Sequence, residues 1–319
     1  MISLHSDKNQ KKVLDVQDLA EVLEIKVSVG ICAYNEERNI GKLLAALLKQ
    51  ETKNVSMHQI LVVSVSTDGT NSIVKKYRRK DERIKLVIQK KREGKASAVN
   101  LFLKEATGDV LVLLSADTWP KKSTVENLVV PFLDSHTGMT GGRPIPTNDC
   151  RKFIGAVSFL LWRLHHEVSS ANIENPKIGE IIAFRNVIRY IPKDTVVDEA
   201  WIEMAIRKKG FAVRYVPDAV VYNHGPENIS DFLKQRRRIY NGHLQLKKKG
   251  GYEVPTMKIS KIMKVIPRVL GYSLKDLFFF IGAVFLEVYG RFLGAYDFYV
   301  KKTNPYIWDM ATSTKEVKI

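Results

Sequence analysis

Between Val27 and Asp117 the sequence alternates short apolar runs with segments of helical period, and this alternation restricts the fold more than any other feature. The strand-like runs are VSVGICA, ILVVSVS, IKLVIQ and DVLVLLSAD, and the helix-like segments between them are NIGKLLAALLKQ, TDGTNSIVKKYRRK and GKASAVNLFLKEAT. Strands that alternate with helices of this length form βαβ units, which build a parallel sheet buried on both faces. We therefore predict an α/β fold of Rossmann-like type, with a mostly parallel central sheet flanked by helices.

After Pro120 the same signals continue less regularly. FIGAVSFLLWRLHHEVSS predicts a helix, GEIIAFRNVI a strand, and DEAWIEMAIRKKG a helix that Gly210 ends before the strand FAVRYV. GGRPIPTND is predicted to be a loop because it is rich in Gly, Pro and Asn. Residues 13–25 have apolar positions near helical spacing, which predicts a short amphipathic helix ahead of the sheet.

Length and composition are those of a globular protein. The chain has 319 residues and a hydrophobic fraction of 45%, which suit about two domains or one large α/β domain. Its two cysteines, Cys32 and Cys150, neither pair by spacing nor suggest a zinc site. The N-terminus through Lys12 is polar and lacks the apolar core of a signal peptide. We therefore expect a reducing, cytoplasmic setting.

The formal net charge of +17 predicts an anionic partner. The excess is local, because twelve Lys or Arg residues lie between Lys234 and Lys275 against one acidic residue, Glu253. Nucleic acid is disfavoured as the partner, since this region lacks aromatic residues interleaved with basic ones on a recognition surface. Nucleoside diphosphates and an anionic membrane surface remain.

Polar residues follow three of the predicted strands, at the edge where parallel α/β sheets bind their ligands. A basic loop lies between the second and the third of them. The four loops are Ala33-Tyr34-Asn35-Glu36, Ser66-Thr67-Asp68-Gly69-Thr70, Arg92-Glu93-Gly94-Lys95 and Ser115-Ala116-Asp117-Thr118. Taken alone, each is explained equally well as a turn or a helix cap. Their order along one sheet edge favours a shared binding site.

Together with three later segments, these loops resemble those of family 2 glycosyltransferases, which have the A-type glycosyltransferase fold. The resemblance extends from Val27 to Gly242. The later segments are the acidic pair Asp198-Glu199, the strand Val216 to Tyr222 and the segment Gln235 to Tyr240. The resemblance implies an enzyme that moves a sugar from a nucleoside-diphosphate sugar to an acceptor hydroxyl with inversion. It favours a UDP-sugar as donor and Mg²⁺ or Mn²⁺ as cofactor.

The resemblance also assigns roles to individual residues. In the family the first loop and the STDGT turn hold the nucleobase and ribose, a Gly-Lys pair borders the nucleotide, and a strand-ending Asp-x-Asp holds the metal. Glu199 then becomes the general base, with Asp198 as the next candidate, although both also suit a non-catalytic place at a helix N-terminus. The donor-binding residues implied are Ala33, Tyr34, Asn35, Glu36, Ser66, Asp68, Gly94, Lys95, Ala116, Asp117, Gln235 and Arg238.

The chain departs from the family pattern at two acidic positions. The Asp-x-Asp is Ser115-Ala116-Asp117 here, and Ser64-Val65 lacks the acidic residue found before the STDGT turn. A hard cation then has one carboxylate and needs the diphosphate, waters and a further side chain. We expect His224 to be that ligand beside Asp117, with a capping or packing histidine as the alternative. Weak metal binding, or none, is left open by this pattern.

The C-terminal third carries the basic excess. Residues 257–266 (MKISKIMKVI) predict a basic amphipathic helix that ends near Pro267, a pattern typical of membrane-surface binding. Residues 277–298 predict a helix with a wide, Phe-rich apolar face, but Glu287 and Arg291 interrupt the run and disfavour a membrane span. This helix packs either on the catalytic domain or in the membrane interface. Residues 236–238 (RRR) are predicted to close over the diphosphate, with a solvated or lipid-facing helix face as the alternative.

These patterns predict three regions: an N-terminal tail (1–24), a catalytic domain (25–245) and a basic helical C-terminal region (246–319). Within the domain, 25–120 is expected to bind the nucleotide and 121–245 the acceptor. The acceptor is expected to be a glycan or a lipid-linked molecule, with the enzyme peripheral on the inner face of an anionic membrane. One alternative is a nucleotidyltransferase, although its Gly-rich, Arg/Lys-containing signature is replaced here by AYNE. The other is a catalytically impaired nucleotide-sugar-binding protein, suggested by the two missing acidic residues.

Overall fold

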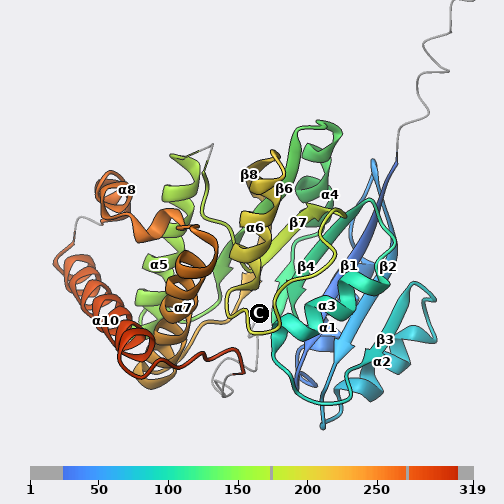
Figure 1. The fold of residues 1–319 in the computed structure, drawn as a ribbon, viewed down its shortest axis with the longest axis horizontal. Coiled ribbons are helices and arrows are strands. Elements are labelled where there is room, and N and C mark those ends of the chain that lie inside the picture. Colours follow the sequence, from blue (N-terminus) through green and yellow to red (C-terminus); the bar gives the residue numbers. More distant parts are fainter. Residues whose placement is uncertain (1–23, 173–174, 271–272, 308–319) are drawn as a thin grey trace, which may run out of the picture.

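The computed structural model describes residues 24–172, 175–270 and 273–307, and a mixed eight-stranded sheet forms its centre (Figure 1). The strand order is β3-β2-β1-β4-β7-β6-β8-β5. Most of the helix predicted over 13–25 lies outside the described residues, which begin at residue 24. The strands are β1 (Ile25–Ala33), β2 (Val55–Ser64), β3 (Ile84–Ile88), β4 (Val110–Ser115), β5 (Thr118–Pro120), β6 (Thr137–Pro146), β7 (Ile181–Arg185) and β8 (Ala212–Asn223).

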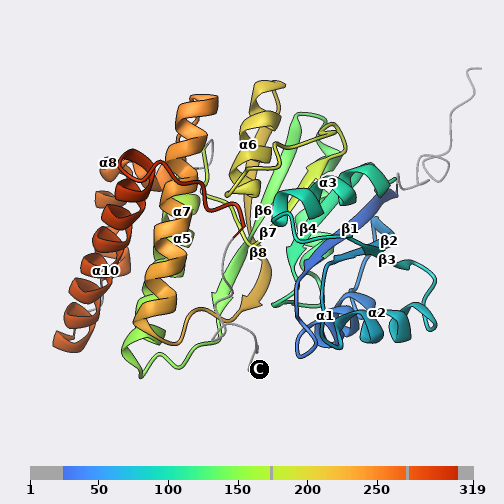
Figure 2. The ribbon, with the colours of Figure 1, turned by 60° about the horizontal axis from the view of Figure 1, so that its bottom comes forward.

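The first half of the sheet confirms the predicted βαβ pattern. Strands β3, β2, β1 and β4 are parallel neighbours, and the helices between them are α1 (Ile40–Leu48), α2 (Thr70–Arg78) and α3 (Lys95–Glu105). Helices α1 and α2 cover one face of the sheet and α3 covers the other (Figure 2). The register pairs Cys32 of β1 with Ser115 of β4, so the loops that follow these strands emerge side by side. The predicted ligand edge therefore exists.

Two hydrophobic cores lie on the two faces of the sheet. Alternate residues of β1, such as Val29 and Ile31, pack with α1, α2 and the helix α4 (Thr124–Val129). On the opposite face, Leu111 and Leu113 of β4 pack with α3 and with the helix α6 (Asp198–Lys208). Since both faces are covered, the strands need apolar residues at successive positions, which explains the continuous apolar runs in the sequence.

The second half of the sheet is mixed. Strand β7 is antiparallel to β4 and β6, β6 is parallel to β8, and β5 is antiparallel to β8. The prediction that GGRPIPTND is a loop is wrong, since β6 runs to Pro146. Strand β7 pairs with β6 only at Met139–Gly141, so Pro144 and Pro146 lie where β6 has one neighbour, and the missing N–H groups are tolerated. The Gly and Pro residues therefore belong to a strand segment that pairs with a neighbour on one side only.

A layer of helices stands beside this half of the sheet (Figure 2). The predicted helix at FIGAVSFLLWRLHHEVSS is confirmed as α5, and α6 ends just before Gly210, whose φ is +85°. The boundary predicted between residues 245 and 246 falls inside α7, so a single helix joins the site to the C-terminal region. The remaining elements are η2 (Val130–Leu133), α5 (Phe153–Ser170), α7 (Ile229–Gly250), η3 (Pro255–Met257), α8 (Ile259–Met263), α9 (Ile266–Val269) and α10 (Leu274–Tyr299).

The basic amphipathic helix predicted over 257–266 is broken into η3, α8 and α9. Pro267 lies in the first turn of α9 instead of ending the earlier helix. Proline is tolerated at that position because the N–H groups of a first turn have no partner within the helix. Ile259 and Met263 remain exposed, while Val265 is buried.

Helix α10 packs on α7 through small residues and ion pairs. A Cβ atom at Gly294 would lie 2.5 Å from the backbone oxygen of Arg237, so the two helices are in close contact there. Arg236 binds Glu287 at 2.6 Å, and Arg237 pairs with Asp297. The prediction that residues 236–238 close together over a diphosphate is therefore wrong for Arg236 and Arg237, which hold α10 in place.

The other face of α10 is exposed and rich in Phe. The exposed fractions of Phe278, Phe285 and Phe292 are 65%, 67% and 65%. By length and composition α10 could cross a membrane, and 22% of its most apolar stretch is buried in the protein. The charges that disfavoured a span in the sequence are neutralised locally, since Glu287 binds Arg291 at 2.8 Å as well as Arg236. One helix therefore both packs on the domain and presents an apolar surface.

Candidate active site

The loops that follow β1 and β2 are tied together by hydrogen bonds. The backbone N–H of Asn35 donates to Ser66 Oγ at 2.9 Å, and that of Thr67 donates to Asn35 Oδ1 at 2.9 Å. Asn35 has φ of +54°, a left-handed conformation that Asn adopts more readily than most residues. Asp68 accepts from the backbone N–H of Thr70, the first residue of α2, at 3.0 Å, although the N-cap position itself is Gly69. Its contact with a nucleotide stays a prediction.

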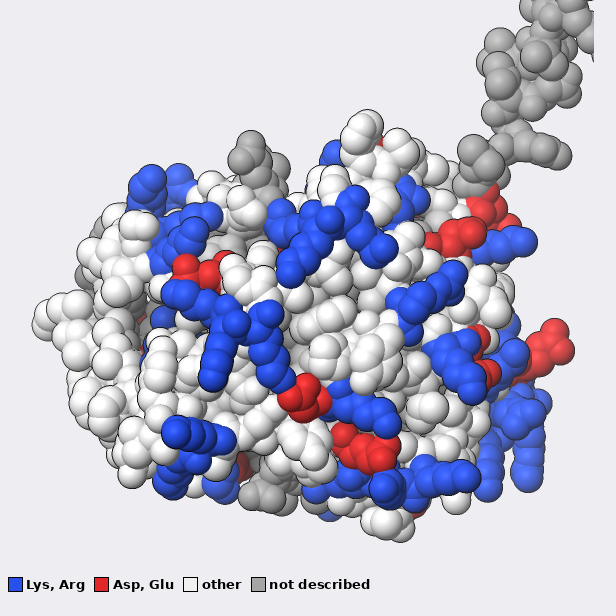
Figure 3. Space-filling model, viewed as in Figure 1, with Lys and Arg blue, Asp and Glu red and all other residues white. Residues whose placement is uncertain are grey.

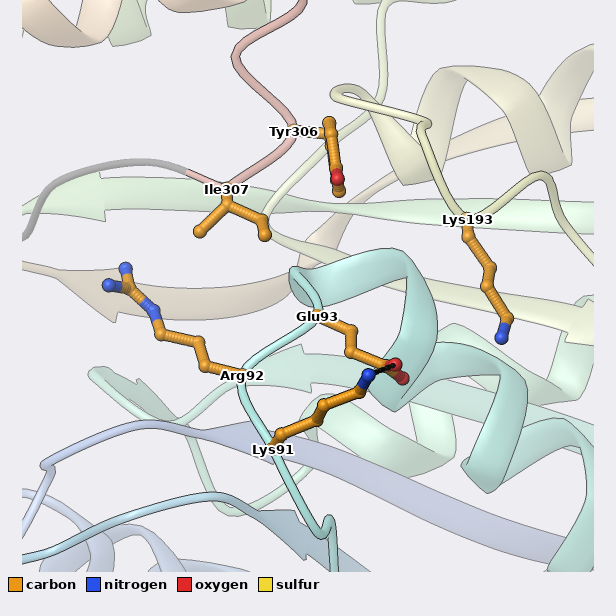
Figure 4. A pocket seen from close by; sticks show the side chains of 6 residues that line it. All are labelled: Lys91, Arg92, Glu93, Lys193, Tyr306 and Ile307. Carbon is orange, nitrogen blue, oxygen red and sulfur yellow. Dashed lines mark ion pairs between the residues drawn. The ribbon is translucent and has the colours of Figure 1, made fainter.

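A basic pocket adjoins these loops (Figure 4). The Arg92 guanidinium lies 4.3 Å from the centre of the Tyr34 ring, which joins the first loop to the basic loop. The pocket has a volume of about 290 Å³ and is lined by Lys91, Arg92, Glu93, Lys193, Tyr306 and Ile307. The last three residues were missed in the sequence, since they follow no strand of the parallel half and no motif marks them. They add a second wall to the predicted nucleotide edge.

Gly94 makes this arrangement possible. Its φ is +86°, and a Cβ atom there would lie 2.7 Å from the backbone oxygen of Tyr306. Both the conformation and the close approach favour glycine. The segment after α10 therefore reaches back to the start of α3, as Figure 2 shows.

Lys95 links the two halves of the site. Its Nζ atom lies 3.0 Å from Asp198 Oδ2 and 2.7 Å from Glu199 Oε1. Burial lowers the pKa of Lys95, but the two carboxylates more than offset this and hold it well above its ordinary value. Lys95 is the first residue of α3, where the helix dipole disfavours a positive charge, and the two carboxylates compensate for this. Asp198 and Glu199 open α6, where the dipole favours negative charge. The predicted donor residue and the predicted base are thus in direct contact.

The two carboxylates differ in environment. Burial and the neighbouring Glu199 raise the pKa of Asp198, whose side chain is 3% exposed. Burial also raises the pKa of Glu199, but Lys95 outweighs it and the pKa ends below its ordinary value, with 23% of the side chain exposed. Glu199 is therefore ionised and reachable by a substrate, whereas Asp198 is enclosed behind it.

Two further charged residues complete this cluster. Burial lowers the pKa of Arg238, while Glu199, Asp198 and Glu180 act on it in the opposite direction. Gln235 is one helical turn before Arg238 on α7, which places both on one side of the helix. Glu180, just before β7, was missed in the sequence because nothing in the order of the parallel strands predicts an antiparallel β7 beside β4.

The predicted metal residues come together at the end of the β5–β8 ladder. Thr118 pairs with Asn223, so Asp117 and His224 are the next residues on the two strands. Both ring nitrogens of His224 have partners, with Nδ1 3.0 Å from Thr147 Oγ1 and Nε2 3.1 Å from Glu227 Oε1. Binding a cation through Nε2 would require Glu227 to give up that contact. Ala116 is buried, and its contact with a donor stays a prediction.

No three His, Cys, Asp or Glu side chains gather into a metal site within the described part of the chain. This arrangement still fits Mg²⁺ or Mn²⁺ bound with a substrate, because such cations are commonly held by one or two carboxylates together with phosphate oxygens and waters. An all-protein metal cage is not what these residues form.

Comparisons with known proteins agree with this geometry. Glycosyl transferase family 2 matches residues 28–192, and Glycosyl transferase family group 2 matches residues 111–296. The "Probable glycosyltransferase YdaM" of Bacillus subtilis is 27% identical over 83% of this chain. The "Poly(ribitol-phosphate) beta-N-acetylglucosaminyltransferase TarS" of Staphylococcus aureus is 29% identical over 47% of it. The chain spans 64% of the length of the first relative and 27% of the second.

A solved structure shows the same fold. The mannosyltransferase PcManGT from Pyrobaculum calidifontis, in complex with GDP-Man and Mn²⁺, superposes with a TM-score of 0.57 and 22% sequence identity. The match covers 86% of this chain and 85% of that one. The A-type glycosyltransferase fold with its long C-terminal helix is thereby shown. The chain therefore belongs to glycosyl transferase family 2.

Proposed function

We propose that the enzyme transfers a sugar from a UDP-sugar to an acceptor hydroxyl with inversion, and that Glu199 is the general base. The observation that carries this proposal is the contact of Lys95 with Glu199 at 2.7 Å. It joins the donor edge of the sheet to an ionised, partly exposed carboxylate. A base must be ionised and within reach of the acceptor proton, and Glu199 meets both conditions better than the enclosed Asp198.

The positive residues of the site suit a diphosphate leaving group. Negative charge gathers on the nucleotide as the bond to the sugar breaks, and fixed positive groups stabilise it. Arg238 is held in the cluster and offers a guanidinium fork for phosphate oxygens. Asp117 and His224 would hold a divalent cation on the diphosphate, which would supply further charge neutralisation.

The donor is tested by thermal unfolding with UDP and with GDP, each with and without Mn²⁺. A nucleotide present at a hundred times its Kd stabilises the folded state by about 2.7 kcal/mol, which raises the melting temperature measurably. UDP is expected to stabilise the enzyme more than GDP. A larger shift with GDP would instead indicate a GDP-sugar donor, the class bound in the structure of the mannosyltransferase PcManGT. No shift with either nucleotide would contradict the proposal.

The base is tested with Glu199→Gln. The variant should bind the nucleotide as the wild type does but lose transfer, since the amide keeps the shape and cannot accept the acceptor proton. Glu105→Gln, at the exposed end of α3, is the matched control and should keep full activity. Full activity of Glu199→Gln would reassign the base, with Asp198→Asn as the next variant. Nucleotide binding without any transfer in the wild type would favour an impaired nucleotide-sugar-binding protein.

For the acceptor we propose a lipid-linked or membrane-proximal glycan on the inner face of an anionic membrane. In Figure 3 the edge formed by α10 is largely uncharged, and Lys and Arg side chains lie beside it over α7 and α8. An apolar, Phe-rich helix face bordered by basic residues suits an anionic interface, where the aromatic rings enter and the cations meet headgroups. The exposed hydrophobics of this face include Leu274, Leu277, Phe278, Ile281, Phe285, Val288 and Phe292.

This part of the proposal is tested by flotation with phosphatidylcholine vesicles, with and without phosphatidylglycerol. The wild type should float with the anionic vesicles, and Phe285→Asp should reduce the bound fraction. Tyr190→Asp is the control, because Tyr190 is 53% exposed but distant in sequence from the α8–α10 region. Absence of wild-type binding to both vesicle types would refute the membrane proposal and leave the transfer reaction untouched.

A further inference from the structure

Glu180 occupies a specific place relative to the metal side of the site. Strands β4 and β7 are antiparallel, and their last pair is Leu114 with Ile181. Glu180 directly precedes Ile181, and Ser115 directly follows Leu114, so the two residues flank the end of this ladder. An acidic residue therefore precedes β7 at the same end of the ladder at which Ser115 follows β4 without a carboxylate.

The conformation of Glu180 is constrained. Its φ is +64°, in the left-handed region that non-glycine residues seldom occupy. Such a conformation costs free energy and persists at binding sites where the surroundings enforce it. The carboxylate of Glu180 nevertheless has no hydrogen-bond or ion-pair partner among the residues that the structure describes. It is held beside the site without a partner of its own.

The charged groups around Glu180 indicate which kind of ligand would suit it. Burial, followed by the negative charges of Asp117 and Glu199, raises the pKa of Glu180 to about 7. Lys95 and Arg238 oppose this rise, but both also face the Asp198–Glu199 pair. Asp117 and Glu180 are thus two acidic groups close enough for the charge of one to disfavour ionisation of the other. A divalent cation would remove that repulsion.

We propose that Glu180 is a second acidic ligand of the cation that accompanies the donor, and that it acts with Asp117. Strand β7 then supplies, from across the ladder, the carboxylate that Ser115 cannot. Two carboxylates plus diphosphate oxygens and waters are a common environment for Mg²⁺ and Mn²⁺, and they need no third protein ligand in contact beforehand. This inference rests on the proposed use of a nucleoside-diphosphate sugar.

The test measures Mn²⁺ affinity directly, by electron paramagnetic resonance of free Mn²⁺, with UDP and with GDP present. Glu180→Gln should weaken Mn²⁺ binding in the presence of the nucleotide by at least about tenfold, since removal even of outer-shell partners costs roughly 10–100-fold. Glu105→Gln is the control and should bind Mn²⁺ as the wild type does. Adding Ser115→Asp to Glu180→Gln returns a carboxylate to the opposite strand, and should restore most of the affinity.

The outcomes separate the alternatives. Unchanged Mn²⁺ affinity in Glu180→Gln overturns the inference, and a simultaneous loss of sugar-nucleotide affinity would make Glu180 a sugar contact instead. A wild type that binds neither UDP nor GDP would remove the proposed function itself, which is a different failure. If Glu180→Gln does not fold, Glu180→Asp is measured instead, because it keeps the charge but draws the carboxylate back by one methylene group; Mn²⁺ binding should weaken, and an unchanged affinity would refute the inference.

Discussion

Lys95→Met tests whether the buried cation balances the two carboxylates of the site. Lys95 is 16% exposed and lies within 3.0 Å of Asp198 and 2.7 Å of Glu199. Met keeps an unbranched chain of similar length but removes the charge. Removing one partner of a buried ion pair typically costs about 3–5 kcal/mol, because the other charge stays buried without compensation. The free energy of unfolding at about pH 7.5 should fall by that amount.

The pH dependence identifies the cause of this loss. Without Lys95, burial and mutual repulsion raise the pKa of both carboxylates in the folded state above the unfolded values. The folded variant then binds protons that the unfolded chain does not, so its stability falls as pH rises and recovers as pH falls. The effect is about 1.4 kcal/mol per pH unit for each group that titrates. The pKa of Asp198 is already raised in the wild type, so Glu199 accounts for most of the difference, and between about pH 7.5 and about pH 5.5 the loss should shrink by up to roughly 3 kcal/mol.

The measurement is urea unfolding at both pH values, followed by tryptophan fluorescence and circular dichroism. Lys122→Met is the matched control, because Lys122 pairs with Glu51 at 3.2 Å while both side chains are mostly exposed. It should cost less than about 1 kcal/mol at either pH. An equal loss for Lys95→Met at both pH values would show that packing, and not unbalanced charge, explains it.

Three further predictions concern packing, conformation and protonation. Gly294→Ala should destabilise the protein by about 1–3 kcal/mol in urea unfolding, because its Cβ would meet the Arg237 backbone at 2.5 Å. Gly41→Ala in α1 is the control, since its nearest contact is at 3.4 Å, and it should stabilise the protein by roughly 1 kcal/mol. Equal effects of the two substitutions would contradict the close contact of α10 with α7. Gly94→Ala should lower the free energy of unfolding by about 1–3 kcal/mol and weaken nucleotide binding in titration calorimetry, since φ is +86° and a Cβ atom would clash with the backbone of Tyr306. Unchanged nucleotide affinity would show that the C-terminal segment does not contribute to the donor site. Burial holds the pKa of His165 well below 6.5, so below that pH the unfolded chain takes up a proton that the folded one does not, and stability falls. The free energy of unfolding of His165→Phe should decrease less steeply than that of the wild type between about pH 6.5 and about pH 5. Parallel curves of stability against pH for the two proteins would refute this prediction.

The parallel half of the fold was predictable from local signals. Apolar runs alternate with helical segments between Val27 and Asp117, and this pattern has one common solution, a sheet covered on both faces. The loops after β1, β2 and β4 then had to meet at one edge, because parallel strands present their carboxyl ends together. The predicted positions of Asn35, Ser66 and Asp117 follow from that rule alone.

The second half could be predicted only in part. The segments that became α5, α6 and β7 had clear periodicity, but their order in the sheet did not follow from it. The Gly and Pro of β6 indicated a loop because the sequence does not show that this strand has a neighbour on one side only. The broken helix at 257–266 was missed for a similar reason, since Pro267 is compatible with either the end or the start of a helix.

The sequence by itself determined the fold class, the family and the order of the donor loops, because these depend on periodicity and on residues close together in the chain. It also named Lys95, Asp198 and Glu199, but as separate motifs. Only the tertiary structure decided that one lysine contacts both carboxylates and that Arg238, not its two neighbours, faces them. The antiparallel register of β7 likewise decided the place of Glu180. Such contacts join residues far apart in sequence, and their geometry is fixed by how the strands and helices pack.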